Sequence, residues 1–139
     1  MKKTFFSVAI LATLLFSACK PKEPSGENAV IGHWSLTEAH MGLAGITMYG
    51  DVGQIVYEFD NKKVKVIISE SLIEQGYPIF APIDEAGTYS YSIKGTGINF
   101  FKGNQTISCK FALENNGLNL TFDFGREVDG PYYIFEKVR

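Results

Sequence analysis

The chain has 139 residues, of which 14% are aromatic and 20% are charged, and its formal net charge is −2. This length predicts one domain. The scattered basic residues exclude a nucleic-acid-binding protein, because contacts with phosphate backbones need clustered Lys and Arg. Fourteen glycines and eleven phenylalanines beside a single tryptophan favour a turn-rich β-protein over a helical bundle.

The first 18 residues are predicted to be a signal peptide. Two lysines at positions 2–3 precede an apolar run, Phe5 to Phe16, that is too short for a comfortable bilayer span. Small residues at positions 17–18 come directly before Cys19, a pattern that resembles the lipobox of bacterial lipoproteins. The resemblance implies lipidation of Cys19, because two or three acyl chains give stable anchoring where one does not. The alternative is an ordinary secretory signal cleaved after Ala18, with Cys19 as a free thiol.

Residues 19–30 are predicted to be the lipidated cysteine and a flexible tether. The segment after Cys19 is polar, contains two prolines and has no periodicity. By resemblance to lipoprotein sorting, Lys20 in place of an Asp permits outer-membrane delivery, so we expect a lipid-anchored protein of the cell envelope. With Cys19 lipidated, only Cys109 remains and no intramolecular disulfide can form. Cys109 lies in an alternating run and is expected to be a small buried hydrophobic residue rather than a nucleophile.

Alternation of apolar and polar residues predicts eight strands. They are residues 31–38, 54–60, 63–68, 88–94, 98–102, 105–114, 118–124 and 132–138. Tight turns join the last five, and Asn115-Asn116-Gly117 favours a hairpin because Asn and Gly tolerate positive φ. The predicted fold is an all-β, eight-stranded antiparallel up-and-down barrel, since closure removes two exposed sheet edges. A two-sheet sandwich is the alternative.

Two connections, 39–53 and 70–85, are longer than hairpin turns and are apolar for loops, which favours a functional role. In an up-and-down barrel both emerge at the same end and share a rim. Their apolar residues are Met41, Leu43, Ile46, Met48 and Tyr49 in the first, and Leu72, Ile73, Tyr77, Ile79 and Phe80 in the second.

A Gly32-x-Trp34 motif on the first strand, the long loop after it and the ending Tyr133-x-Phe135-x-Lys137 resemble the lipocalin and calycin group, specifically the small lipocalin-like domains of bacterial lipoproteins. The resemblance covers residues 31–139. It implies a barrel whose first long loop folds over the mouth as a lid.

The same resemblance implies that Trp34 packs at the closed end beneath a basic side chain from a late strand, for which Lys137, Arg139 and Arg126 are the candidates. The chain departs from larger lipocalins in lacking the disulfide, in its length and in having no predicted helix after the barrel. Ligand-binding residues therefore cannot be transferred from that family.

No pattern for catalysis or metal binding is present. The two histidines, His33 and His40, lack ligand spacing, although Asp51 or Glu38 lies near His40. The carboxylate pairs Asp84-Glu85 and Glu127/Asp129 are expected to be solvated loop residues. We therefore expect no metal, no cofactor and no enzymatic activity.

Aromatic residues on the predicted inner faces either fill a small core or surround a pocket in which tyrosine hydroxyls orient a ligand. Arg126 is either a turn residue beside acids or a bidentate partner of a ligand carboxylate. The predicted ligand-binding residues are Met41, Met48, Tyr57, Tyr77, Phe80, Tyr89, Tyr91 and Arg126. The sequence thus predicts a membrane-anchored barrel that binds a small apolar or amphipathic molecule. The alternative is a solidly packed barrel that acts as a non-enzymatic interaction protein of the cell envelope, an accessory or an inhibitor.

Overall fold

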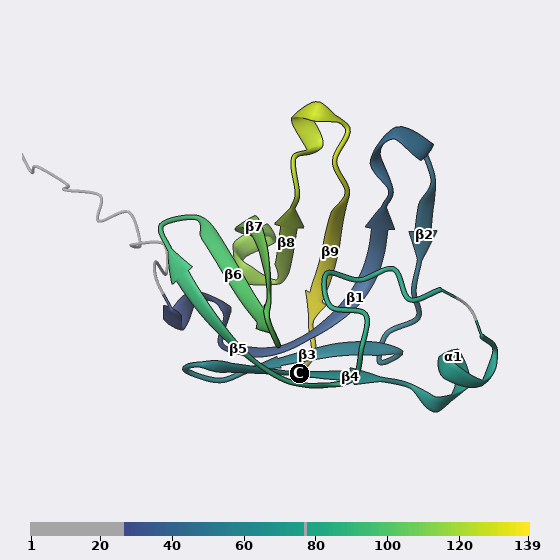
Figure 1. Ribbon diagram of the computed structural model, residues 1–139, viewed down its shortest axis with the longest axis horizontal. Helices are drawn as coiled ribbons and strands as arrows, with labels where there is room; N and C mark the ends of the chain where they lie inside the picture. The colour runs from purple at the N-terminus through teal and green to yellow at the C-terminus, as the bar shows by residue number, and fades with distance from the viewer. Residues whose placement is uncertain (1–26, 77) are drawn as a thin grey trace, which may run out of the picture.

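The computed structural model describes residues 27–76 and 78–139. The predicted signal peptide, Cys19, most of the predicted tether and Tyr77 lie outside these residues. Nine strands form one antiparallel sheet (Figure 1). Their bounds are β1 Gly32–His40, β2 Thr47–Tyr49, β3 Ile55–Phe59, β4 Lys63–Ile68, β5 Gly87–Lys94, β6 Gly97–Lys102, β7 Gln105–Glu114, β8 Asn119–Asp123 and β9 Tyr132–Lys137. The short helices are η1 Glu27–Val30, η2 Gly42–Ala44, α1 Glu70–Glu74, η3 Asn115–Gly117 and η4 Arg126–Val128.

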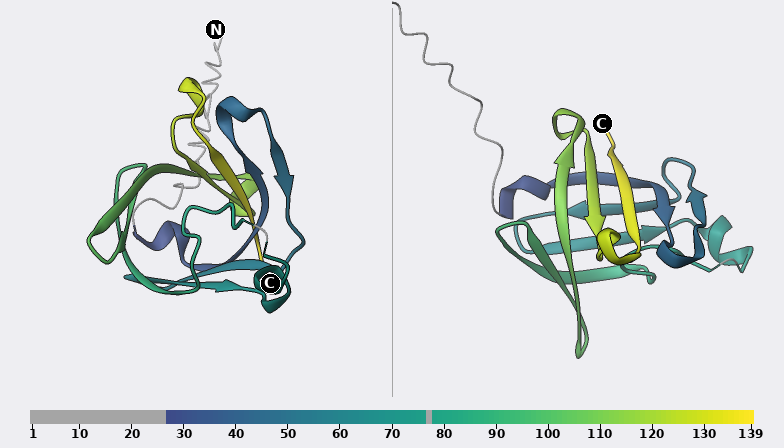
Figure 2. Two further views of the ribbon diagram at one scale, coloured as in Figure 1. Left: turned by 45° about the vertical axis from the view of Figure 1, so that its right-hand side comes forward. Right: turned by 90° about the horizontal axis from the view of Figure 1, so that it is seen from above.

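Eight of these strands close into a barrel. Strands β3 to β9 pair in chain order, and β1 pairs with β3 on one side and with β9 on the other. The closing pairs include Trp34 with Lys137 and Leu36 with Phe135. Figure 2 shows the resulting closed wall from two directions. The predicted up-and-down barrel is confirmed, and the sandwich alternative is excluded because the first and last barrel strands pair with each other.

Two elements lie inside the connections that were predicted to be loops. Strand β2 pairs with the end of β1, and together they form a hairpin that extends beyond the barrel wall. Helix α1 follows β4 directly. Neither element left a periodic signal, because a three-residue strand and a five-residue helix are shorter than the patterns that reveal them.

A β-bulge at Thr37 changes which side chains of β1 face the interior. The register passes from Leu36↔Phe135 to Glu38↔Ile134, so Thr37 is an extra residue on its strand. After the bulge Ala39 faces inward and is 3% exposed. Because alternate residues point to opposite faces, Glu38 and His40 face outward.

Helix η1 covers the closed end of the barrel. Val30 is fully buried, and its carbonyl accepts a hydrogen bond from Trp34 Nε1 at 2.7 Å. The Lys137 ammonium lies 5.4 Å from the centre of the Trp34 ring, so it is the basic side chain that covers this tryptophan. Ala29 and Val30, at the end of the predicted tether, are buried and pack as part of the folded body.

Aromatic rings fill the middle of the barrel. Phe122 lies at its centre, with ring centroids 5.4 Å from Phe135, 5.5 Å from Phe100, 6.3 Å from Phe59 and 6.5 Å from Tyr57. All five side chains are at most 4% exposed. The interior between the closed end and this layer is therefore a packed core. Among the described residues, no helix is long and apolar enough to span a bilayer.

Candidate functional site: a plugged barrel mouth

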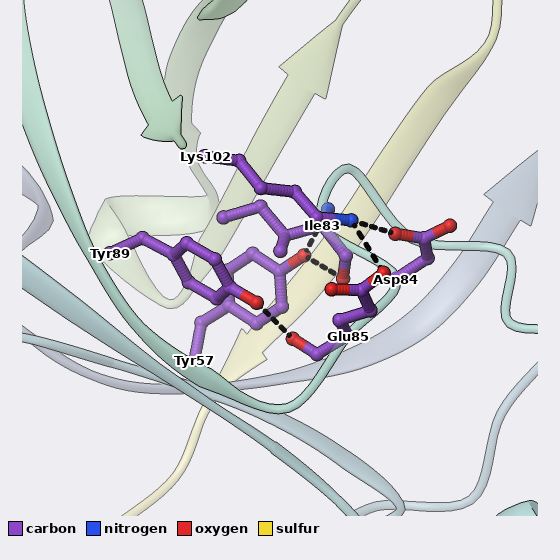
Figure 3. A network of polar contacts seen from close by, with 6 residues as sticks. All are labelled: Tyr57, Ile83, Asp84, Glu85, Tyr89 and Lys102. Atoms are coloured by element: carbon purple, nitrogen blue, oxygen red, sulfur yellow. Dashed lines mark hydrogen bonds and ion pairs between the residues drawn. The ribbon is translucent and has the colours of Figure 1, made fainter. Parts of the chain in front are cut away.

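The mouth of the barrel is filled by the chain itself. Residues 79–85, hereafter the plug, belong to the connection between α1 and β5 and turn into the barrel (Figure 3). Ile83 is fully buried and Pro82 is also buried. Ile79, Phe80 and Ala81 are partly buried against the same core. The second long loop therefore closes the mouth and does not form an open rim.

One buried hydroxyl holds the plug in register. Tyr57 of β3 accepts a hydrogen bond from the Ile83 N–H at 2.6 Å and donates one to the Ile83 carbonyl at 2.9 Å (Figure 3). Burial raises the pKa of Tyr57 well above its usual value. The hydroxyl therefore stays neutral and keeps the proton that it needs to donate.

The outer end of the plug is tied to the barrel wall by polar contacts. Lys102 of β6 lies 2.9 Å from the Asp84 carboxylate and 3.1 Å from that of Glu85. Tyr89 of β5 donates its hydroxyl to the Glu85 carbonyl at 3.0 Å (Figure 3). Both carboxylates are largely exposed, and exposed ion pairs contribute little to stability. The plug is thus held by apolar packing and one buried pair of hydrogen bonds, both of which are reversible.

The β7 wall of the interior is less completely covered than the adjacent β8 wall. The inward-facing side chains of β7 are only half-buried, whereas those of β8, Leu120 and Phe122, are fully buried. The β7 side chains are Ile107, Cys109, Phe111 and Leu113. Burial raises the pKa of the Cys109 thiol to about 12, with a smaller contribution from the Asp123 charge. Cys109 is therefore an uncharged part of this apolar wall.

Two crystal structures share this architecture. One is a lipocalin-like protein from Bacteroides uniformis, 18% identical, with a TM-score of 0.51 over 79% of this chain and 99% of the other. This chain has a lipocalin-like fold. The other structure, an uncharacterized protein from Bacteroides eggerthii, is 14% identical, with a TM-score of 0.50 over 78% and 98% of the two chains. No protein-family model and no curated protein matches the sequence.

Three of the predicted ligand-binding residues lie at or against the plug of this lipocalin-like barrel. They are Tyr57, Phe80 and Tyr89. Tyr91 is buried, and its hydroxyl donates to the Asp60 carbonyl at the closed end, away from the mouth. Tyr77 lies outside the described residues.

The other predicted residues lie on the hairpins that extend beyond the mouth. Met48 pairs opposite Ala39, so it faces the interior side of the β1–β2 hairpin, where it is 39% exposed. Met41 and Arg126 come together, but in a pocket on the outer face rather than at the mouth. The bulge at Thr37, which no sequence pattern revealed, places His40 of β1 on the outer face, where it lines this pocket.

Sequence reasoning missed Ile83 and Lys102, which hold the plug. Asp84 and Glu85 were predicted to be solvated, and they are exposed, but both also pair with Lys102. The sequence feature that could have indicated the plug is an isoleucine directly before two acidic residues, in a loop that contains a proline. Within residues 27–76 and 78–139, no three His, Cys, Asp or Glu side chains gather into a set that could hold a metal ion.

Replacing Tyr57 with phenylalanine is expected to loosen the plug while the barrel stays folded. Both backbone groups of Ile83 would lose their partner, and an unpaired buried polar group costs about 1–3 kcal/mol. Amide hydrogen exchange in residues 79–86 should therefore accelerate by about tenfold or more. Tyr91→Phe, which removes the hydroxyl that donates to the Asp60 carbonyl at the closed end, should leave exchange in the plug unchanged. Equal protection in the two variants would contradict this role for Tyr57.

Closure of the mouth is expected to weaken at low pH. A hydrogen bond from Lys102 lowers the pKa of Asp84, so the closed plug favours the ionised carboxylate. This contribution is present above the usual aspartate pKa and is lost as the pH falls through the lowered value. Exchange in the plug, corrected for intrinsic rates, should thus rise in acid. In Lys102→Met, which lacks the ammonium, the acid-induced rise should be smaller, and an identical rise would count against the ion pair.

Proposed function

We propose that this chain is a lipid-anchored protein of the cell envelope whose lipocalin-like barrel binds a small apolar or amphipathic molecule, without enzymatic activity. The barrel and its structural neighbours support the binding of a small ligand in general. The lipobox-like residues before Cys19 support the anchor, and the polar segment after it supports a tether.

The observation that carries the ligand proposal is the plug against a half-covered apolar wall. A ligand that displaces Ile83 would contact the inward side chains of β7, which the chain itself covers incompletely. Displacement would also free the Tyr57 hydroxyl, which can then donate to or accept from the polar end of the ligand. The plug and the ligand therefore exclude each other, and binding selects the open form of the mouth.

Native mass spectrometry of protein purified from its own host tests the proposal directly. We expect a retained small molecule. In addition, titration of the delipidated protein with laurate should accelerate hydrogen exchange in residues 79–86 and shift the amide resonance of Cys109. No retained molecule, together with no response of the plug to laurate, would reject ligand binding in the barrel.

The anchor is tested separately by the mass of the mature protein. We expect a chain that starts at Cys19 and carries two or three acyl groups, and expect Cys19→Ser to release the protein from the membrane fraction. A mature chain with an unmodified cysteine would support the ordinary secretory signal instead.

A second candidate function is docking on another envelope protein through the tip of the β1–β2 hairpin. Residues 41–50 contain no charged side chain. Large apolar side chains on the hairpin and the loop after it are unusually exposed: Leu43 is 87%, Tyr49 is 78%, Val52 is 65% and Ile46 is 54% exposed. Large exposed apolar side chains gathered on one hairpin are typical of an interaction site.

Cross-linking in intact cells distinguishes docking from ligand binding. We expect one partner to be captured by the wild-type protein and lost in Leu43→Ser/Tyr49→Ser. Ile73→Ser is the matched control, because Ile73 is 59% exposed on α1, outside the hairpin. Capture that is equal in all three proteins would reject the hairpin tip as the docking surface.

A further inference from the structure

A pocket lies on the outer face of the sheet, away from the plugged mouth. It has a volume of about 210 Å³ and lies between the β1–β2 hairpin and the β8–β9 connection, which project side by side in Figure 1. It is lined by His40, Met41, Ile46, Thr47, Arg126, Asp129 and Tyr132, together with Gly42, Gly45 and Gly130. It combines one exposed cation, one exposed carboxylate, an aromatic pair and an apolar side.

Backbone contacts between the two hairpins build the pocket in advance. Leu43 N–H donates to the Asp129 carbonyl at 3.2 Å. Gly42 has φ +48°, and a Cβ added there would lie 1.8 Å from the Asp129 carbonyl oxygen. The two tips can therefore approach this closely only with glycine at position 42. The walls of the pocket are joined to each other and do not depend on two independent loops.

Two stacked aromatic rings form the floor of the pocket, and the His40 ring has no free nitrogen for a ligand. His40 and Tyr132 stack with centroids 4.0 Å apart and planes within 9°. Both His40 ring nitrogens already have partners, since Nε2 lies 2.9 Å from Glu38 Oε2 and Nδ1 lies 2.9 Å from Thr47 Oγ1. The imidazole is thus held in place and supplies a flat surface rather than a hydrogen bond to a ligand.

Arg126 is the group left for recognition. Its guanidinium carbon lies 5.0 Å from the centre of the Tyr132 ring, and its Nε lies 3.9 Å from Asp123 Oδ2. Asp123 Oδ1 accepts hydrogen bonds from Gly125 N–H at 2.8 Å and Arg126 N–H at 2.7 Å, which fix the turn. Among the described residues, none accepts a hydrogen bond from the terminal guanidinium nitrogens of Arg126. The side chain is 57% exposed, so these donors are available to an anion.

We propose that this pocket binds a small monocarboxylate that carries an apolar or aromatic group. The carboxylate pairs with the terminal nitrogens of Arg126, and the apolar part lies against Met41 and Ile46. The volume corresponds to about seven water molecules, which suits a compact ligand rather than a long acyl chain. Asp129 lines the pocket and Glu38 lies beside its floor, and both disfavour ligands of higher negative charge. The site is separate from the barrel interior and does not depend on ligand binding there.

NMR titration of the ¹⁵N-labelled protein with benzoate, inorganic phosphate and benzylamine tests the site and its chemistry. We expect benzoate to shift the amides of Thr47, Arg126 and Gly130, and expect phosphate and benzylamine to bind at least about tenfold more weakly. Equal binding of phosphate would overturn the proposal, as would preferential binding of benzylamine.

Three variants locate the binding. Arg126→Met should weaken benzoate binding by about tenfold or more, because charge-assisted hydrogen bonds are lost. Gly42→Ala should also weaken it by forcing the hairpin tips apart, whereas Arg139→Met, which removes the other arginine, should bind as the wild type does. Unchanged affinity in Arg126→Met would overturn the proposal, as would benzoate shifts that cluster in residues 79–86 instead of this pocket.

Discussion

Replacing Phe122 with alanine is expected to lower the free energy of unfolding by about 3–5 kcal/mol, the usual result of truncating a buried phenylalanine. Phe122 is fully buried at the centre of the barrel, and its ring packs against rings from three other strands, β3, β6 and β9. A cavity at this point removes packing from every side at once. Urea unfolding followed by tryptophan fluorescence measures the change.

Phe101→Ala is the matched control for the same loss of volume. Phe101 is 41% exposed on the outer face of β6, next to the buried Phe100. We expect a change below about 1 kcal/mol, as is usual for surface substitutions. Equal losses in the two variants would mean that the aromatic cluster is not the centre of the core.

Replacing Ile83 with alanine is expected to open the mouth and to tighten the binding of an apolar ligand. Truncating a buried isoleucine costs about 2–5 kcal/mol where the site cannot relax. Here the loss falls on docking of the plug, because Ile83 belongs to a connection and not to a barrel strand. Only molecules with an open mouth bind laurate, so the apparent affinity is proportional to the open fraction. A larger open fraction should therefore tighten laurate binding by about tenfold or more.

Ile98→Ala is the control for this effect. Ile98 is as fully buried as Ile83, but it lies in β6, within the barrel wall. Its truncation should lower global stability without tightening laurate binding and without a selective rise in hydrogen exchange at residues 79–86. If Ile83→Ala weakened laurate binding instead, the plug would be part of the ligand site rather than its competitor.

The strand pattern could be predicted because the barrel imposes an inside and an outside on each strand. In β4, buried Val64, Val66 and Ile68 alternate with more exposed residues. β7 begins and ends at the predicted residues, Gln105 and Glu114. The hairpin at 115–117 was also predicted correctly, since Asn115 and Asn116 take φ values of 51° and 56°. These are local properties, which a pattern in the sequence can predict.

The candidate site could be predicted only in part, because it depends on contacts between distant segments. Whether an apolar loop residue projects outward or folds inward is decided by its partner. Ile83 is buried because it meets Tyr57, 26 residues earlier. The extra residue at Thr37 likewise shifts the faces of β1, and it is visible only in the pairing with β9. Alternation within one strand cannot reveal either effect.

Joining the first strand to the last has a kinetic consequence. The hydrogen bond from Thr37 to the Ile134 carbonyl links residues 97 positions apart, and the whole β1–β9 pairing has a similar separation. Contacts of such long range slow folding, because loop closure must precede any gain from them. The barrel can therefore be completed only after the C-terminal residues have been synthesised and are free to move, and until then β1 lacks its neighbour on one side.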